Sequence, residues 1–200
     1  DIDLTGSINT NTASTTITAS DGAGIDLGTA AVANNLDLLD TELANITTTG
    51  LNLVTSGTIR VDNVSAGNTA TISGTTLLDT STGVSFDNNA STFTNTLDVQ
   101  ADDGIAVNAD VTVNNGDLSL DGDADDAVDT NDDIQFVNNI TVTAENDLNL
   151  DAMSGGMTAT GLLTLNATNN DINVNTSLAS DSITMTAGNN VNINIGTAAG

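Results

Sequence analysis

The chain alternates apolar and polar residues in short runs, and turns rich in Asn, Asp and Gly separate the runs. Alternation with a period of two places one set of side chains inside and the other in solvent, so it predicts β-strands. The strands are expected to be about three to five residues long and to recur every 6 to 11 residues or so. The clearest apolar–polar–apolar runs are 25–27, 51–53, 59–61, 97–99, 105–107, 111–113, 118–120, 140–142, 148–150, 163–165, 172–174, 183–185 and 191–193.

A longer echo joins two of these runs and the turn between them. Residues 111–122 read VTVNNGDLSLDG, and residues 140–152 read ITVTAENDLNLDA. The offset of about 29 or 30 residues lies in the range typical of solenoid repeats. Each repeat of that size leaves an apolar face unburied until the next repeat stacks on it.

These patterns favour a β-solenoid over a β-sandwich. Sandwich strands usually run about five or six residues, whereas a strand that crosses one side of a coil can be shorter. The fold class we predict is therefore all-β, a parallel β-helix of roughly 8–10 coils at about 20–25 residues per coil. We expect one continuous domain over 1–200 with an acidic loop inserted at 121–133. The absence of Pro agrees, because every coil must donate backbone N–H groups to its neighbour.

One segment departs from the pattern. Residues 31–45, AVANNLDLLDTELAN, carry four Leu and are compatible with a helical turn or two. The alternation of Leu36, Asp37 and Leu38 favours a strand followed by a longer loop.

Composition changes the picture in two ways. The chain has three Phe and no Trp or Tyr, so its core must consist of small aliphatic side chains in a regular, narrow interior. Low aromatic content and a net charge of −26 also suit a disordered chain. The abundance of Thr, Val and Ile and the patterned apolar positions favour strands and turns instead.

The charge excludes several partners. Nucleic acid requires many cationic groups, and Arg60 is the only Lys or Arg of the chain. An anionic membrane surface would repel it, and no run of about 18 apolar residues predicts membrane insertion. No signal peptide is apparent, and a chain that begins at Asp1 is expected to be processed or cut from a longer one. With no Cys, disulfides and thiolate metal sites are excluded.

The texture of the sequence resembles a known family. The runs ANITTTGLNLVTSGTIRVDNV (44–64), NNITVTAENDLNLDA (138–152) and NNDINVNTSLASDSITMTAGNNVNINI (169–195) are similar to bacterial surface proteins of the filamentous-haemagglutinin and autotransporter type. The resemblance extends over nearly the whole chain without a sharp motif. It implies a right-handed parallel β-helix and an extracellular or cell-surface location, and it carries over no functional residue.

The densest candidate site is the acidic segment DGDADDAVDTNDD at 121–133. Clustered carboxylates are the hard oxygen ligands that Ca²⁺ takes, six to eight at a time. The segment lacks the Gly and Glu positions of an EF-hand loop, so it matches no standard calcium motif. The alternative is a solvated acidic loop that binds no ion. The candidate calcium ligands are Asp121, Asp123, Asp125, Asp126, Asp129, Asp132 and Asp133.

Catalytic groups are scarce. The chain has no His, Cys, Lys or Tyr, which removes the usual general bases and nucleophiles. Arg60 is expected to pair with a carboxylate of a neighbouring coil. We therefore predict that the protein is not an enzyme. The favoured function is a structural subunit or segment of an extracellular filament that associates with itself through uncapped solenoid ends. The alternative is a stalk or ligand-binding region of a secreted adhesin, with a cell-surface or glycan ligand and a possible dependence on calcium.

Overall fold

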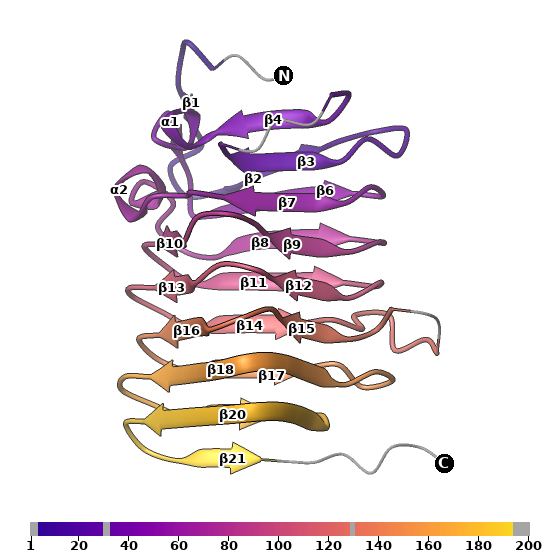
Figure 1. Ribbon diagram of the computed structural model, residues 1–200. Helices are drawn as coiled ribbons and strands as arrows, with labels where there is room; N and C mark the ends of the chain where they lie inside the picture. Colours follow the sequence, from indigo (N-terminus) through magenta and orange to yellow (C-terminus); the bar gives the residue numbers. More distant parts are fainter. Residues whose placement is uncertain (1–3, 30–32, 129–130, 194–200) are drawn as a thin grey trace.

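The computed structural model describes residues 4–29, 33–128 and 131–193. In these residues the protein is all-β, with parallel strands stacked along one axis (Figure 1). Helical structure is limited in the described residues to two single turns, α1 (Asp40–Leu43) and α2 (Ala66–Thr69).

One sheet of eight strands runs the length of the stack. We call it the first face. All seven pairings between its neighbouring strands are parallel. In order its strands are β2 (Ser14–Thr18), β6 (Gly50–Thr55), β8 (Thr76–Thr80), β11 (Leu97–Ala101), β14 (Leu118–Asp121), β17 (Leu148–Asp151), β19 (Ile172–Val174) and β21 (Val191–Ile193).

The second sheet has eleven strands in two columns. The second face consists of β4 (Leu36–Leu39), β3 (Ile25–Gly28), β7 (Ile59–Asp62), β9 (Val84–Phe86), β12 (Ile105–Val107), β15 (Ile134–Phe136) and the first parts of β18 (Met157–Ala167) and β20 (Leu178–Ala187). The third face consists of β10 (Ser91–Phe93), β13 (Val111–Val113), β16 (Ile140–Ala144) and the second parts of β18 and β20. Two short strands, β1 (Ile8–Asn9) and β5 (Ile46–Thr47), pair separately.

The columns join where β18 and β20 bend from one face to the next. Their pairing shifts in register between Ala159 and Leu162, at a bend where Gly161 has a φ of 79°. Because a left-handed backbone costs glycine little, the strand turns this corner without ending. In the coils nearer the N-terminus the same corner separates two strands.

Each circuit of the chain, here called a coil, adds one strand to the first face and one to the second before the next circuit begins. This arrangement is consistent with a parallel β-solenoid. Every apolar–polar–apolar run that the sequence identified lies in a strand, so these predictions are confirmed. In segment 31–45 the favoured strand is present as β4, and the alternative helical turn follows it as α1.

The register corrects one detail of the predicted repeat. Leu118 pairs with Leu148, as the echo implied. Val111, however, pairs with Val142 and not with Ile140. The chain can shift by two residues in the preceding turn because such a shift returns the same side chains to the inner face.

The number of residues in a coil varies widely, whereas the stacking of strands does not. Asn192 hydrogen-bonds to Asn173, 19 residues earlier, and Asn52 contacts Thr16, 36 residues earlier. Interior coils have intermediate lengths, such as the 30 residues between Asn149 and Ser119. Most of the extra residues lie in the corners between faces, and the 36-residue coil also contains β4.

The core is one continuous apolar column between the faces. The inward residues of the interior strands are almost all fully buried, and Phe86, Phe93 and Phe136 are each 1% exposed. Each Phe is the last residue of a three-residue strand. The expectation of a narrow interior built from aliphatic side chains holds along most of the stack.

The N-terminal end carries an additional strand. After β3 the chain returns, and β4 lies beyond β3 in parallel register, with Leu36 beside Ile25. Glu42 of α1 is 8% exposed and accepts hydrogen bonds from the backbone N–H groups of Leu4 and Leu39. This carboxylate therefore ties the N-terminal segment to β4.

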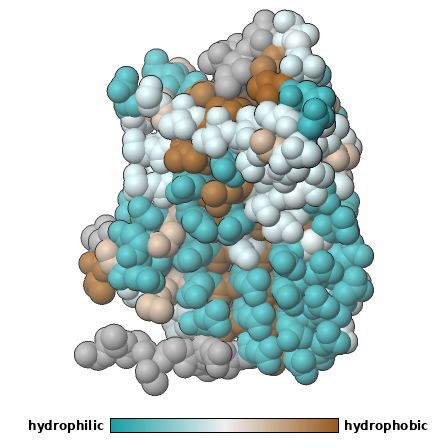
Figure 2. Space-filling model, turned by 180° about the vertical axis from the view of Figure 1, so that it is seen from behind, coloured by the Kyte–Doolittle hydropathy of each residue, from teal (hydrophilic) through white to brown (hydrophobic). Residues whose placement is uncertain are grey.

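Polar side chains form ladders on the outside of the first face. Asn192 donates to Asn173, Asn173 donates to Asn149, and Asn149 donates to Ser119, with donor–acceptor distances of 2.9–3.3 Å. Figure 2 shows the side of the molecule opposite to that of Figure 1, on which hydrophilic side chains surround apolar patches along the middle. Stacked amides satisfy one another as in other parallel arrays.

Candidate functional site

The predicted acidic segment forms the connection between β14 and β15, which projects from one corner of the stack (Figure 1). Asp121 ends β14 and accepts a hydrogen bond from the backbone N–H of Asp123 at 3.2 Å. Asp123 is 1% exposed, and its Oδ2 accepts a hydrogen bond from the backbone N–H of Ser154. Ala124 N–H donates to Ala101 O in the preceding coil. Backbone contacts to both neighbouring coils thus hold the start of the segment.

Stacking brings carboxylates of different coils together at this corner. Asp121 pairs in register with Asp151 of the next coil. Burial, and next the charges of Asp151, Asp123 and Asp126, raise the pKa of Asp121 above its ordinary value. Burial and the charges of Asp126 and Asp123 likewise raise the pKa of Asp151, although hydrogen bonds oppose them. We call Asp121, Asp123 and Asp151 the acidic corner.

A further carboxylate of the preceding coil borders the acidic corner. Burial raises the pKa of Asp102, and the negative charges of Asp125, Asp79, Asp103 and Asp123 raise it further. Asp102 was not among the candidate ligands that the sequence identified. Its proximity depends on which coils stack on which, and the sequence did not reveal that order.

The other predicted ligands differ in their surroundings, and the charge of Asp126 acts on Asp121 and Asp151 of the acidic corner. Asp125 Oδ1 accepts the backbone N–H of Ala127 at 2.9 Å, and Asp126 has a left-handed backbone with a φ of 55°. Asp132 is 5% exposed at the far end of the segment, and Asp133 lies on the second face beside the groove described below. Asp129 lies outside the described residues.

Two carboxylate oxygens of the acidic corner stand out. Asp123 Oδ1 and Asp151 Oδ1 are buried and accept no hydrogen bond from the described residues. Buried carboxylate oxygens without a hydrogen-bond donor are favoured by a nearby cation. Among residues 4–29, 33–128 and 131–193, however, no three acidic side chains converge as a metal site. Calcium binding at 121–133 therefore stays a prediction.

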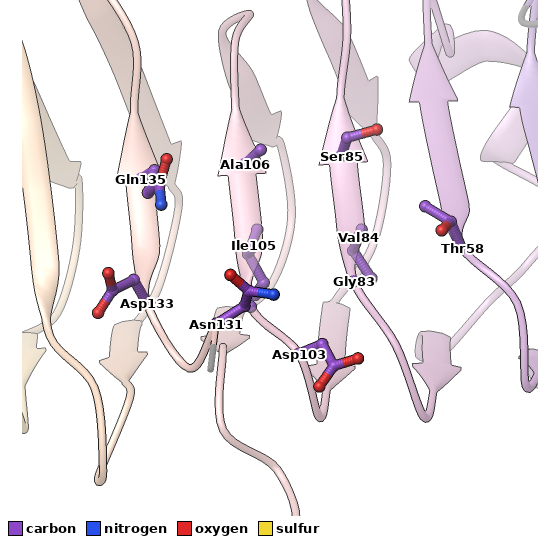
Figure 3. A pocket seen from close by; sticks show the side chains of 11 residues that line it. Thr58, Gly83, Val84, Ser85, Asp103, Ile105, Ala106, Asn131, Asp133 and Gln135 are labelled. Atoms are coloured by element: carbon purple, nitrogen blue, oxygen red, sulfur yellow. The ribbon is translucent and has the colours of Figure 1, made fainter. Parts of the chain in front are cut away.

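A shallow groove of about 260 Å³ runs across the second face beside this corner (Figure 3). The floor of the groove is formed by the short outward side chains of Ser85 and Ala106, which are register partners. Gln135 is the register partner of Ala106 on the next strand, β15. Asp103 and Asn131 lie at the edge of the groove. The lining mixes carboxylate and amide groups, such as those of Asp103 and Gln135, with apolar surface, and it contains no aromatic side chain.

Arg60 lies on the same face. Its Nε contacts Asp87 Oδ2 at 2.9 Å, which confirms the predicted ion pair with a neighbouring coil. Burial acts to raise the pKa of Asp87, but hydrogen bonds from Asn108, Arg60 and Ser85 outweigh it and hold the pKa below its ordinary value. The arginine is committed to this network, which makes it a structural element of the second face.

A second carboxylate fixes the turn after β9. Asp62 is 6% exposed, and its two oxygens accept hydrogen bonds from the Asn88 side chain and from the backbone and side chain of Asn89. Burial acts to raise the pKa of Asp62, and these hydrogen bonds overcome it and lower the pKa. Asp62 therefore joins two successive coils.

The two ends of the stack differ from its interior. Apolar side chains that contact the core but stay partly exposed all lie there: Leu4, Ile8, Ile17, Ala23 and Leu36 at one end, and Leu178, Met185 and Ala187 at the other. Val191 in β21 is 43% exposed and Ile183 in β20 is 38% exposed. The inner column is thus incompletely covered at both ends by the described residues.

No described helix is long and apolar enough to cross a membrane. Comparison with known proteins gives no matching family, no matching curated protein and no matching solved structure. The function is therefore argued from the geometry alone.

Proposed function

We propose that the protein is a structural segment of an extracellular fibre, a right-handed parallel β-helix whose copies associate end to end. The observation that carries the proposal is the contrast between a buried interior column and partly exposed apolar side chains at both ends. Unpaired strand edges beside apolar side chains are templates for further pairing. A head-to-tail contact of this kind does not close, so it produces a filament.

Three further features support the proposal. Eight strands on the first face supply eight coils, within the predicted range. Right-handed winding follows from the strong preference of parallel strand crossovers for that hand. The ladders of Asn on the outside repeat from coil to coil, as expected for a fibre whose surface is periodic.

Catalysis has little support. The side chains of the groove and the acidic corner offer carboxylates, amides and hydroxyls, and the sequence has no His, Cys, Lys or Tyr to pair with them. We therefore infer a non-enzymatic role.

A substitution at the free edge of β2 tests the proposal. Thr49 N–H donates to Ala13 O and Ala19 N–H donates to Val54 O, so residues 13, 15, 17 and 19 direct their backbone groups to β6. The backbone N–H of Thr16 therefore points to the open edge. Thr16→Pro removes a donor that only a further strand would use, whereas Thr16→Val retains it.

We expect wild-type protein and Thr16→Val to form long filaments by electron microscopy and sedimentation. Thr16→Pro should stay monomeric with a nearly unchanged Tm. If wild-type protein sediments as a monomer at all concentrations, or if Thr16→Pro forms the same filaments, the end-to-end proposal is wrong.

The groove favours a second candidate, a ligand-binding region of an adhesin. The carboxylates and amides of its mixed lining can hydrogen-bond to a glycan or a cationic surface group. If this is the function, the monomeric Thr16→Pro variant should bind cells or glycans as well as wild-type protein does.

A further inference from the structure

The two ends of the stack are stepped, and the steps are complementary. On the second face, β4 lies one strand beyond β3. β3 belongs to the same coil as β2, the first strand of the first face. At the opposite end, the first face extends one strand further, because β21 lies beyond β19 and the described second face stops at β20. Figure 1 shows β4 and β21 at opposite extremes of the stack. Among the described residues, one end is therefore longer on the second face and the other end is longer on the first face.

The backbone has a direction along the stack as well. Inward residues direct their N–H groups toward the C-terminal end: Ile25 donates to Thr58, Leu51 to Thr75 and Ile59 to Gly83. At the C-terminal end, the backbone groups of Val191 and Leu178 point along the stack toward the open edge. The reason is that Asn190 O and Ser177 O, from the residues immediately before them, already accept bonds from the preceding strands. At the first strands the same alternation leaves outward residues such as Thr16 and Asp37 without a backbone partner among the described residues. The N-terminal edge therefore presents outward residues and the C-terminal edge presents inward residues, so a parallel ladder can continue from one copy to the next.

From these two observations we propose a specific register for the end-to-end contact, an inference that rests on the proposed fibre function. β21 of one copy pairs with β2 of the next, and the first part of β20 pairs with β4 of that same next copy. Val191 then lies over Thr15, and Leu178 lies over Leu36. The hydrogen-bonded ladders of the first and second faces then continue from one copy to the next without a gap. This is because β4 of the next copy occupies, on the second face, the level that β21 occupies on the first face.

The side chains and charges agree with this register. Inner positions meet inner positions, so partly buried Leu178 and Leu36 cover each other. Outside, Asn192 meets Thr16, and an Asn–Thr contact already occurs between Asn52 and Thr16. The chain has 27 acidic residues, yet β2 and β21 contain none. The strands themselves therefore add no like-charge repulsion to the β21–β2 contact, whereas β4 carries Asp37 and β20 carries Asp181.

Cysteine cross-linking tests the register, since the chain has no Cys of its own. Register partners in neighbouring parallel strands are about 4.8 Å apart, within the range of about 4.4–6.8 Å between Cα atoms that a disulfide requires. We expect the full-length double variant Thr16→Cys/Asn192→Cys to form a ladder of covalent multimers on oxidation. Asp37→Cys/Ala179→Cys should do so on the second face.

Matched controls exclude chance contacts. Asn173 lies in the same outward column as Asn192, but β21 covers its strand. The double variant Thr16→Cys/Asn173→Cys is therefore expected to form no multimers. The single variants Thr16→Cys and Asn192→Cys can form dimers only in head-to-head or tail-to-tail contacts, so multimers longer than dimers are expected only from the two double variants that match the register.

The outcomes separate the register from the function. Multimers from both double variants, with none from the controls, support the inference. Filaments by electron microscopy without cross-linking in either pair overturn the register and leave the fibre proposal standing. Cross-linking of the first pair alone overturns the complementary steps. Absence of any association overturns the register and the fibre proposal together.

Discussion

The acidic corner offers a sharp test, because removing one of its charges should stabilise the protein. Asp121 and Asp151 are register partners, and burial and mutual repulsion raise the pKa of both. Asp121→Asn removes a charge and keeps an oxygen that can accept the Asp123 backbone N–H. We therefore expect a gain in the free energy of unfolding at pH 7.

The size of the gain follows from the stacking distance. Carboxylates of neighbouring strands lie about 5 Å apart, and two unit charges at that distance repel by about 0.8 kcal/mol in water or about 3 kcal/mol at an effective dielectric of 20. Both side chains are half-buried, so screening by solvent brings the expected gain to about 1 kcal/mol. For a chain of this size that corresponds to a rise in Tm of roughly 2–4 °C.

The pH dependence tests the direction of the stability change independently. A carboxyl whose folded pKa is raised costs stability above that pKa, and the cost disappears as the pH falls toward the ordinary value of 3.8. The difference between Asp121→Asn and wild type should thus be largest at pH 7 and close to zero near pH 4. Thermal unfolding monitored by circular dichroism across this range measures it, with Asp181→Asn as a control that removes one charge elsewhere.

Bound calcium would oppose the expected gain in stability. In the presence of a chelator, Asp121→Asn should be more stable than the wild type, and a less stable variant would refute the prediction. If millimolar Ca²⁺ raises the Tm of the wild type but not of Asp121→Asn, while Mg²⁺ has no effect, the corner binds calcium as the sequence predicted.

Two more predictions concern the core and the turn after β9. Phe136→Ala should cost about 3–5 kcal/mol, because the ring is 1% exposed; hydrogen exchange of the neighbouring coils would show the loss, and a cost under about 1 kcal/mol would contradict the packing. Asp62→Asn should cost about 1–3 kcal/mol at pH 7, since it places an amide against the donors of Asn88 and Asn89. The pKa of Asp62 is lowered, so its contribution is present above the ordinary value of 3.8 and lost as the pH falls through the folded pKa; denaturant melts of both proteins should therefore converge at low pH, and a constant difference would argue against the charge.

Much of the fold was accessible from the sequence because strand and turn signals are local. Period-two alternation located the strands, and Leu118 with Leu148 located one true repeat. The strands that end in Phe86 and Phe93 were less apparent, because Ser occupies an outer position in one and an inner position in the other.

What the sequence did not provide was long-range stacking. A two-residue shift preserves the inner face, so the pattern alone cannot distinguish Val142 from Ile140 as the partner of Val111. The return of β4 onto β3 depends on a contact at the end of the stack and has no periodic signal. For the same reason the acidic segment looked like one cluster, whereas Asp151 of the next coil joins Asp121 and Asp133 departs to the groove.

The variable coil length described above has a consequence for reach. A ladder rises by about 4.8 Å at each pass of the chain, whether that pass uses 19 residues or 36. The length of the first face therefore depends on the number of passes and not on the number of residues in each pass. The residues described between β14 and β15 add surface at one corner without adding a strand to the first face. If the protein acts as the fibre segment proposed above, the segments at its corners can vary in length while the length of the first face stays the same.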